Sequence, residues 1–413
     1  MVGALRLFNP GLPRKVWVLQ FGVLVNFFGN GLVAPFLVIY LHYGRQIPLG
    51  FAGSAVALGG ITAVTSGLLA GSLADRLGSR NILVAAMVSN AAAYLLYTQV
   101  TASWQAYAVG LLVGVGTGSY GPSSQLLIAS MVPPEGRQAA FAQNRVTSVL
   151  GLGLGGLAGG LLAAGGLQGY LRILALDAAT FLAFAAVVLL LPSDRGHAPG
   201  GMRGGYAEVL RDRPFLRLAG ANLAMVTAGI APMFWLLPAY AKVQLHVGEA
   251  AIGLIYSLNT TTVVVAQLPI VRVTRGRNRM HALRTGAMIW VACWLVCLGA
   301  AAGFSAPAAA LIIGLASIGY AFGECLYSSI MLPTATMLAP DRLRGRYLGV
   351  MGFAWQGGFF IGPTAGGAIL GAFPPALPVA CAAGCLLAAV ATAAADRSFA
   401  ADLRVVPARA GST

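Results

Sequence analysis

The sequence predicts an all-α membrane protein with twelve transmembrane helices in two pseudo-symmetric six-helix bundles. Three observations support this fold: the composition, the number of long apolar runs, and a repeat between the two halves of the chain. Of the 413 residues, 58% are hydrophobic and only 9% are charged, and the mean hydropathy is +0.79. A soluble globular domain has roughly 25% charged residues, so the chain is expected to be polytopic.

Each predicted helix is an apolar run of about 18 or more residues, because roughly 20 helical residues cross a hydrocarbon core about 30 Å thick. The expected spans cover residues 16–41, 51–73, 81–100, 104–130, 139–164, 173–191, 218–241, 251–270, 285–302, 306–331, 347–371 and 375–395. Residues 1–15 lack the pattern of a cleavable secretory signal and are expected to form a short cytoplasmic tail.

The net charge of +15 follows from membrane topology. No polar stretch is long enough to form the basic surface of a nucleic-acid-binding domain, so nucleic acid is not an expected partner. With both termini cytoplasmic, the outside connections hold only Arg45, Arg172 and Lys242, and Arg145 lies within a span. All other Lys and Arg residues then lie in cytoplasmic segments, as the positive-inside rule requires. Arg far outnumbers Lys, which indicates a GC-rich bacterial gene and hence the bacterial inner membrane.

The two halves of the sequence repeat each other. Pro35 in GLVAPF corresponds to Pro232 in AGIAPM. A glycine ladder at Gly151, Gly155 and Gly159 corresponds to a second one at Gly358, Gly362 and Gly366. Residues 1–192 and 216–413 are therefore expected to be the N-terminal and C-terminal bundles, with residues 193–215 as a cytoplasmic linker. A substrate cavity is expected between the two halves.

The connection between the second and third spans carries a recognisable motif. Its sequence, GSLADRLGSRN at residues 71–81, resembles the loop signature of the major facilitator superfamily. The matching residues are Gly71, Asp75, Arg76, Gly78 and Arg80. In that superfamily the acid resembles a conformational latch on the cytoplasmic side; the alternative is a turn that only sets topology. The corresponding loop of the second half, residues 269–281, has Val273 in place of the acid.

Across most of its length the chain resembles the twelve-helix drug:proton antiporter family of this superfamily. Asn26, Asn30 and an acid on the tenth span suit that family, and GFFIGPTAGG at residues 358–367 resembles a glycine-proline element of exporters. The resemblance implies a secondary active transporter that exports amphiphilic drugs or natural products in exchange for protons, by alternating access.

The corresponding element of the fifth span departs from the exporter pattern and leaves an alternative function open. In the fifth span, Gly156 stands where exporters have the proline. This departure favours a proton symporter or facilitator that imports a small organic solute. An enzyme or a receptor is a further alternative from a different class, but the spans contain no paired acids, no Ser/His pair and no metal cluster at matching depth. The expected protein is therefore not an enzyme.

Glu324 is the first candidate for proton coupling. It lies in an apolar run in which an ionised carboxylate costs at least about 2.5 to 3.5 kcal/mol on insertion scales. A buried carboxyl group favours its neutral form, so it can load and release a proton near neutral pH. The alternative is a permanently protonated residue with a packing role. Asp177 is the second candidate, about five residues inside the sixth span; there a structural pair with Arg172 is the alternative.

Polar and aromatic residues on seven of the spans are expected to line an amphipathic cavity. They are Asn26, Asn30, Tyr120, Gln125, Arg145, Asn222, Trp235, Tyr256, Asn259, Tyr320, Tyr327, Trp355 and Gln356. Mostly apolar walls with a few polar groups suit a moderately hydrophobic solute, although each residue alone could equally serve packing. Trp290 and Trp294 of the ninth span are expected to face lipid instead.

No metal or cofactor is expected. The five cysteines lie inside spans and are interpreted as small helix residues, and the four histidines lie in or beside loops. The proton gradient is the expected energy source. The expected partners are a small-molecule substrate, protons and the lipid bilayer, with the protein acting as a monomer.

Overall fold

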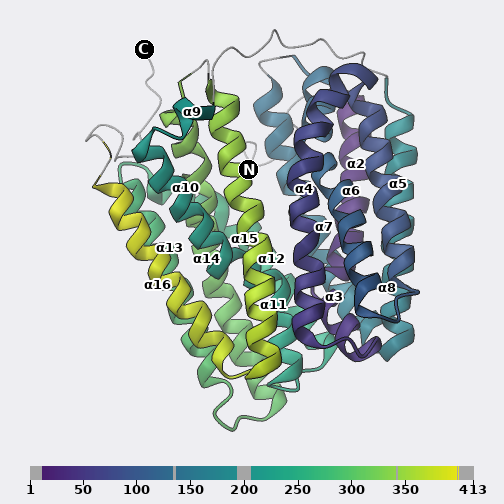
Figure 1. The fold of residues 1–413 in the computed structure, drawn as a ribbon, viewed down its shortest axis with the longest axis vertical. Coiled ribbons are helices and arrows are strands. Elements are labelled where there is room, and N and C mark those ends of the chain that lie inside the picture. Colours follow the sequence, from purple (N-terminus) through teal and green to yellow (C-terminus); the bar gives the residue numbers. More distant parts are fainter. Residues whose placement is uncertain (1–11, 134–135, 193–205, 341–342, 398, 400–413) are drawn as a thin grey trace, which may run out of the picture. The chain divides into compact units, whose positions relative to one another are not determined.

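The computed structural model describes residues 12–133, 136–192, 206–340, 343–397 and 399, and these residues form helices and connecting turns without any strand. The chain divides into two compact units (Figure 1). Unit 1 comprises Met1–Ile47 and Leu58–Ala198, and unit 2 comprises Pro48–Ala57 and Pro199–Thr413.

Unit 1 is a bundle of long helices. Its elements are α2 (Arg14–Val33), α3 (Leu37–Ile39), the π-helix η1 (Tyr40–Gly44), α4 (Leu49–Leu77, whose first turns group with unit 2), α5 (Ser79–Tyr97), α6 (Ser103–Met131), α7 (Arg137–Ala163) and α8 (Gly166–Leu189). Helix α2 packs against α7 and α8, while α5 packs against α6 and α8. The bundle interior therefore lies around α2, α5 and α8.

The contact between α2 and α7 in unit 1 depends on glycine. A Cβ atom added to Gly155 of α7 would overlap the carbonyl oxygen of Phe28 on α2, and one added to Gly31 would overlap the carbonyl oxygen of Leu152. Both neighbours are backbone atoms, which cannot rotate away. The glycine ladder predicted from the sequence thus brings two helix backbones into direct contact, as small-xxx-small patterns do in membranes.

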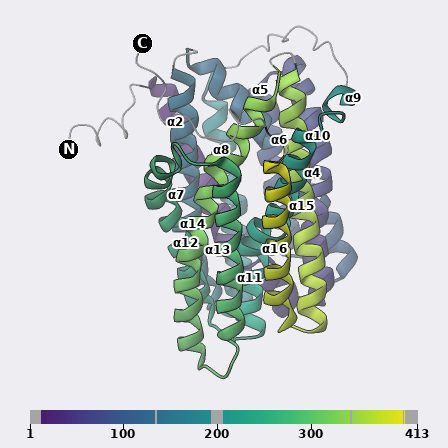
Figure 2. The ribbon, with the colours of Figure 1, turned by 90° about the vertical axis from the view of Figure 1, so that its left-hand side faces the viewer.

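Unit 2 repeats this architecture with one extra short helix. Its elements are α9 (Tyr206–Val209), α10 (Arg213–Met225), the π-helix η3 (Val226–Ile230), α11 (Ala231–Val243), α12 (Glu249–Thr274), α13 (Arg279–Gly299), α14 (Ala306–Leu338), α15 (Arg344–Ala372) and α16 (Ala376–Asp396). Helix α13 lies between α14 and α16, and α12 packs on the other side of α14 (Figure 2). Helix α10 packs against α15 and α16.

The same backbone features recur in both units. Gln46 and His246, which follow the first long helical stretch of each unit, have φ angles of 57° and 53°. Gly78 and Gly276 follow the next helix of each unit and have φ angles of 86° and 71°. A positive φ angle is rare for a residue with a side chain, so its recurrence at matching positions shows that the two halves share their turns as well as their helices.

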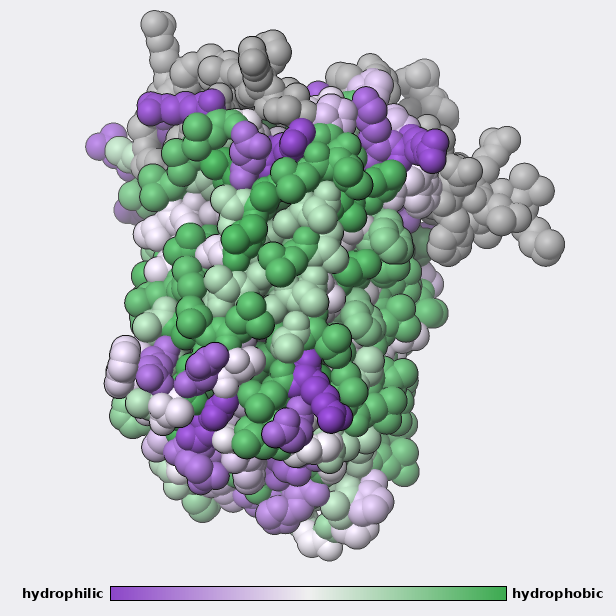
Figure 3. Space-filling view, turned by 90° about the vertical axis from the view of Figure 1, so that its right-hand side faces the viewer, coloured by the Kyte–Doolittle hydropathy of each residue, from purple (hydrophilic) through white to green (hydrophobic). Residues whose placement is uncertain are grey.

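Helix length and composition fit a lipid environment. Among the described residues, nine helical segments are long and apolar enough to cross a membrane. Helices α5, α6 and α15 are not among the nine, although they have 19, 29 and 29 residues. Figure 3 shows a broad hydrophobic belt between two hydrophilic ends. Large exposed side chains such as Leu161 and Leu189 contribute to the apolar surface, which suits contact with lipid tails.

Candidate functional site

One face of α14 carries the strongest candidate site. Tyr320, Glu324 and Tyr327 are spaced four and three residues apart, so they lie on the same side of the helix. Glu324 is half-buried near the middle of α14, and both tyrosines are buried. The structure thus brings together three residues that the sequence analysis had selected separately. We call this set the Glu324 face.

Tyr327 ties the Glu324 face to two neighbouring helices. Its hydroxyl donates a hydrogen bond to Oδ1 of Asn222 on α10, with an O···O distance of 2.5 Å. The Nδ2 of Asn222 in turn donates to the carbonyl oxygen of Met351 on α15, at 3.2 Å. Asn222 is only 2% exposed. A buried amide that bridges three helices in this way fixes their relative positions within unit 2.

We expect Tyr327→Phe to destabilise unit 2 by about 1–3 kcal/mol, because Oδ1 of the buried Asn222 would lose its hydrogen-bond donor. Thermal unfolding of the purified protein measures the effect. Asn222→Ala and the double variant complete a cycle, in which the double variant should be hardly less stable than Asn222→Ala alone. Fully additive losses would contradict the coupling.

Tyr256 approaches the Glu324 face from α12. It interacts electrostatically with Glu324, and its buried hydroxyl has no hydrogen-bond partner among the described residues. An unsatisfied buried hydroxyl next to a carboxyl group is available to donate a hydrogen bond to the ionised carboxylate. Tyr256 and Tyr327 therefore place two aromatic residues beside the one acid of this face.

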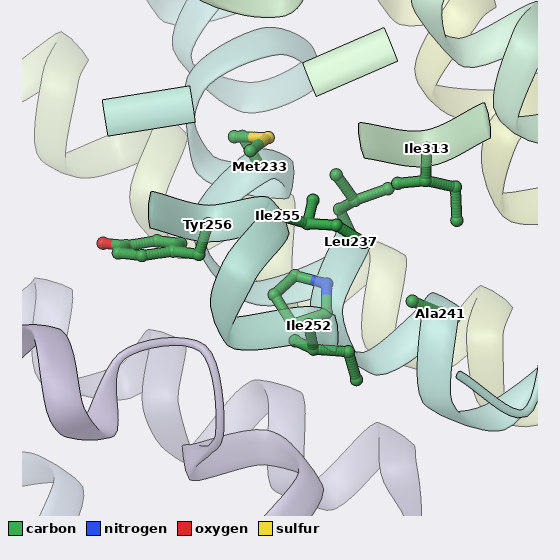
Figure 4. A pocket seen from close by; sticks show the side chains of 8 residues that line it. Met233, Leu237, Ala241, Ile252, Ile255, Tyr256 and Ile313 are labelled. Atoms are coloured by element: carbon green, nitrogen blue, oxygen red, sulfur yellow. The ribbon is translucent and has the colours of Figure 1, made fainter. Parts of the chain in front are cut away.

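A small pocket lies beside Tyr256 (Figure 4). Its lining residues come from α11, α12 and α14 and are Met233, Leu237, Pro238, Ala241, Ile252, Ile255, Tyr256 and Ile313. The tyrosine hydroxyl is the one polar side-chain group in this lining, and it points away from the aliphatic side chains in Figure 4. The pocket fits an apolar group of a ligand and offers no charge of its own.

The π-helix η3 interrupts the helical stretch formed by α10 and α11. A π-helix shifts the hydrogen-bond pattern and leaves carbonyl groups available to side chains. The Tyr320 hydroxyl donates to the carbonyl oxygen of Gly229, and the Cys385 thiol donates to that of Ala228 at 3.3 Å. Since π-helices are frequent at functional sites, this segment strengthens the assignment of the Glu324 face.

The two tryptophans expected to face lipid are instead buried. Trp290 is fully buried and Trp294 is 1% exposed. Trp290 stacks on Tyr320 with a centroid distance of 5.4 Å, and its Nε1 donates to the Tyr320 carbonyl oxygen at 3.0 Å. The glycines at positions 229 and 323 leave room for its indole ring, because a Cβ atom at either position would overlap it. The lipid-facing prediction was therefore wrong.

Other predicted cavity residues of unit 2 have separate environments. Asn259 of α12 is buried and donates to the carbonyl oxygen of Ser317 on α14, at 3.1 Å, which is a packing contact. Trp355 of α15 lies against Tyr327 with a centroid distance of 6.0 Å, so it adjoins the Glu324 face. Gln356 and Trp235 are half-buried. Of these four residues, only Trp355 has a contact described here with a residue of the Glu324 face.

A polar cluster one turn beyond Glu324 was not predicted from the sequence. Ser328 donates to Oε1 of Gln267 at 3.0 Å, and Nε2 of Gln267 donates to Ser329 at 2.9 Å. Ser328 follows Glu324 by four residues and therefore lies on the same face of α14. That spacing was readable in the sequence. The cluster extends the polar surface from Glu324 toward the predicted cytoplasmic end of α12 and α14.

Asp177 lies deeper than the sequence analysis predicted. Helix α8 begins at Gly166 and not near residue 173, so Asp177 is at the middle of the helix and is fully buried. Arg172 is exposed, so the two side chains lie on different faces and the structural pair given as the alternative does not form. The earlier start of the helix explains the depth of Asp177, and the five-residue spacing places Arg172 on another face.

The surroundings of Asp177 come from three helices of unit 1. Thr180 donates to its Oδ1 at 3.2 Å, and a side chain at Gly29 of α2 would overlap the carboxyl group. Tyr94 of α5 interacts with it electrostatically. Its Oδ2 is buried without a hydrogen-bond partner in the described part of the chain. A carboxyl group buried within a membrane helix suits a proton carrier as well as a packing role.

The remaining predicted residues of unit 1 have contacts of their own. Asn26 is buried and accepts at its carbonyl oxygen a hydrogen bond from Nδ2 of Asn30, at 2.8 Å. Tyr120 packs edge-on against Phe27 with a centroid distance of 5.8 Å. Gln125 and Arg145 are exposed.

The motif loop has a structural role that the structure describes in part. Gly78 adopts a φ angle of 86°, which requires glycine between α4 and α5. Arg80 donates from Nη1 to the carbonyl oxygen of Leu191, at 2.9 Å, and so caps the end of α8. Arg76 is exposed in the last turn of α4. Gly71 lies within α4, and the side chain of Asp75 lies outside the described atoms.

The described residues contain no group of three or more His, Cys, Asp or Glu that could hold a metal ion. The chemistry of the Glu324 face is therefore that of one acid among tyrosines, amides and hydroxyls. Such a set can bind and release a proton and can attract a cation, and it offers no nucleophile-base pair for covalent catalysis.

A family profile and individual relatives of this chain point to the same protein family. The Major Facilitator Superfamily profile matches residues 19–363 and 236–399. The chain is 27% identical over 372 residues to the uncharacterized MFS-type transporter YhjO of Bacillus subtilis, covering 89% of this chain and 90% of that protein. It is 23% identical over 354 residues to the multidrug resistance protein MdtH of Aeromonas salmonicida. The alignment covers 86% of this chain and 87% of that protein.

A solved structure shows the same fold. A mutant form of the nucleoside transporter NupG superimposes with a TM-score of 0.76 over 92% of this chain and 100% of that chain, at 15% identity. The predicted all-helical major facilitator fold is thereby confirmed.

Proposed function

The chain belongs to the major facilitator superfamily and is a secondary transporter in a membrane, not an enzyme, and we propose that it exports amphiphilic small molecules in exchange for protons. Within the superfamily, we assign the chain to the twelve-helix drug:proton antiporter family. This proposal rests on the motif resemblance and on the similarity to MdtH, which is named as a multidrug resistance protein. Drugs or natural products are the proposed substrates.

One observation carries the proposal. Glu324 is a half-buried acid near the middle of an apolar helix, and it interacts with Tyr256 and Tyr327. Placing an ionised carboxylate in an apolar membrane helix costs free energy, so such a residue is by default a candidate for a functional role. Protonation removes the charge, and deprotonation restores an attraction for a cationic amphiphile. Proton and substrate thus compete for the same face.

The other predicted residues take supporting roles in this proposal. The aromatic and amide groups around Glu324, with Asn26, Asn30, Tyr120, Gln125 and Arg145 of unit 1, line the substrate path. Asp177 is a second proton-binding group. Asp75 and its loop form a latch of the alternating-access cycle. In this arrangement residues 1–192 and 216–413 act as two six-helix bundles joined by residues 193–215.

We further propose that the protein lies in the inner membrane of a bacterium with both termini cytoplasmic, and works as a monomer without a cofactor. The relatives described above are bacterial, and the distribution of Lys and Arg favours this topology. Each proton that enters the cell down the electrochemical gradient then supplies about 2.3 kcal/mol per 100 mV for transport.

The test is gradient-driven flux in proteoliposomes. A lumen more acidic than the medium drives protons out of the vesicle, so an antiporter accumulates a fluorescent cationic amphiphile inside. We expect accumulation with an acidic lumen and none without a gradient. The measurement works for either orientation of the protein in the vesicle, because the gradient alone sets the direction.

The same vesicles separate export from the alternative, import by symport. A symporter accumulates its solute when the lumen is more alkaline than the medium, which is the opposite sign of gradient. Accumulation of a sugar, nucleoside or other small organic solute under an alkaline lumen, with no response to an acidic one, would replace the antiport proposal. Chemical analysis of the accumulated compound shows that it is moved unchanged.

A further inference from the structure

The end of α12 and the start of α13 form a strongly basic stretch. Its basic residues are Arg272, Arg275, Arg277, Arg279 and Arg284. No acidic residue occurs between Glu249 and Glu324. The positive-inside rule accounts for exposed arginines in such a connection, and four of the five are exposed. Arg279 is only 3% exposed, so the burial of this one side chain needs a separate explanation.

Arg279 has no counter-charge within the described part of the chain. Its Nε is enclosed without a hydrogen-bond partner there, and the residue forms none of the ion pairs found among the described side chains. Asp396, the last residue of α16, reaches the start of α13, but its Oδ1 accepts from Nδ2 of Asn278 at 3.2 Å. A buried charge without a partner costs free energy, so an anion bound from outside the chain would stabilise Arg279.

The guanidinium of Arg279 is enclosed at its base and not at its tip. Among its three nitrogens, only Nε belongs to the enclosed, unpartnered atoms of the described structure. This pattern fits an arginine that buries its apolar stem and keeps its charged end accessible. Side chains of an α-helix lean toward the N-terminus of that helix, so the tip lies at the start of α13.

The first turn of α13 adds a second group of anion-binding atoms. Asn278 caps this helix, because its Oδ1 accepts from the backbone N–H of His281 at 2.8 Å and its carbonyl oxygen accepts from Ala282. The N–H groups of Arg279 and Met280, the first two helical residues, have no intrahelical acceptor. They point toward the same end of the helix as the guanidinium, and the helix dipole adds partial positive charge there.

The start of α13 lies at the level of lipid headgroups. The 21 residues of this helix extend over about 30 Å, which matches the thickness of the hydrocarbon core. The first residue therefore lies at one boundary of the core. In the proposed topology, the distribution of Lys and Arg makes this the cytoplasmic boundary.

Apolar surface lies close to the start of α13. Arg279 precedes Gly286 by seven residues and shares its helix face, where an added Cβ at Gly286 would lie 3.2 Å from the Gly323 carbonyl oxygen of α14. Successive contacts show that α13 and α14 run in opposite directions. Arg279 is therefore level with the segment of α14 around Leu332, which is 56% exposed, while Val273 in the last turn of α12 is 53% exposed. Acyl chains can use this surface, and a small free anion cannot.

We propose that the start of α13 binds the phosphate group of an anionic phospholipid. The Arg279 guanidinium and the uncapped N–H groups of the first turn hold the phosphate, and the exposed arginines attract the negatively charged leaflet. The apolar surface at Val273 and Leu332 accepts the acyl chains. No covalent bond forms or breaks. The choice of the inner leaflet rests on the proposed topology, whereas binding itself does not depend on the proposed transport activity.

Native mass spectrometry of the full-length protein in detergent tests the site. The delipidated protein is titrated with phosphatidylglycerol or with phosphatidylcholine, which carries a phosphate but no net charge. We expect tighter binding of phosphatidylglycerol, and Arg279→Gln should weaken it by about 10-fold or more because charge-assisted hydrogen bonds are lost. Arg279→Lys keeps the charge and should restore part of the binding.

Arg277→Gln is the matched control, because it removes the same charge from an exposed side chain two residues away. At high salt an exposed charge is screened, so this variant should bind phosphatidylglycerol like the wild type. Equal weakening by Arg277→Gln and Arg279→Gln would show a general basic surface and overturn the proposal. Displacement of the lipid by excess inorganic phosphate would assign the site to a free anion and would also overturn it.

Hydrogen exchange of the wild type does not depend on the folding of variants. Bound phosphatidylglycerol should slow exchange at the amides of Arg279 and Met280, because the phosphate accepts from these N–H groups. Phosphatidylcholine should have little effect there, and peptides from the middle of α16 should exchange alike with both lipids. Equal exchange at the start of α13 with the two lipids would contradict a phosphate bound at this helix terminus.

Discussion

Glu324→Gln should abolish accumulation driven by a pH gradient, with a loss of about 100-fold or more, because an amide cannot bind and release a proton near neutral pH. The amide keeps nearly the same size and hydrogen-bonding capacity, so α14 should remain folded. Proteoliposomes with an acidic lumen measure the loss. Exchange of labelled for unlabelled substrate at equal pH should persist, since that reaction needs no net proton movement.

The matched control makes the same chemical change elsewhere. Glu249→Gln removes the charge that pairs with Lys242, whose Nζ lies 2.8 Å from Oε1 of Glu249 in a salt bridge. That pair lies at the start of α12, away from the middle of α14, and its variant should accumulate substrate like the wild type. Wild-type accumulation by Glu324→Gln would end the coupling role of Glu324.

Gly155→Ala should have the largest effect on stability. The added methyl group would overlap the backbone carbonyl of Phe28, which cannot move without displacing α2 from α7. Overpacking of this kind costs about 3 kcal/mol, the upper part of the usual range, because the neighbour is backbone and not a side chain. Thermal unfolding in detergent and the yield of monodisperse protein measure the loss.

Gly352→Ala on α15 is the matched control, because no atom lies within 4 Å of the position its Cβ would take. It should leave the unfolding temperature unchanged or raise it, since alanine favours a helix over glycine. Equal destabilisation by both variants would show that loss of glycine flexibility, and not the contact between α2 and α7, is responsible.

The fold was predictable because lipid leaves few choices. Apolar runs of membrane length must be helices, and the repeated prolines and glycines indicated two related halves. The helix ends were less predictable: α8 starts at Gly166, where the residues are small and mildly polar, and the error moved Asp177 from an edge to the middle of its helix. Hydropathy marks the apolar centre of a span but not its ends.

The acid of the candidate site could be predicted from the sequence, whereas the residues packed around it were harder to predict. Glu324 could be identified because an ionised carboxylate in an apolar membrane helix costs free energy. Trp290 was misplaced because its burial depends on glycines of two other helices, at positions 229 and 323, which provide the space for its ring. The Gln267 and Ser328 contact likewise joins residues that are far apart in the chain. Packing between helices, rather than the character of one helix, decides such positions.

The π-helix η3 also sets the rotation of one helix segment against the next. An α-helix turns about 100° per residue, so a segment with one residue too many shifts the faces on its two sides by about that angle. Asn222 lies before η3 and Trp235 lies after it. The segment Val226–Ile230 therefore sets the face that α11 presents relative to the face of α10 on which Asn222 meets Tyr327.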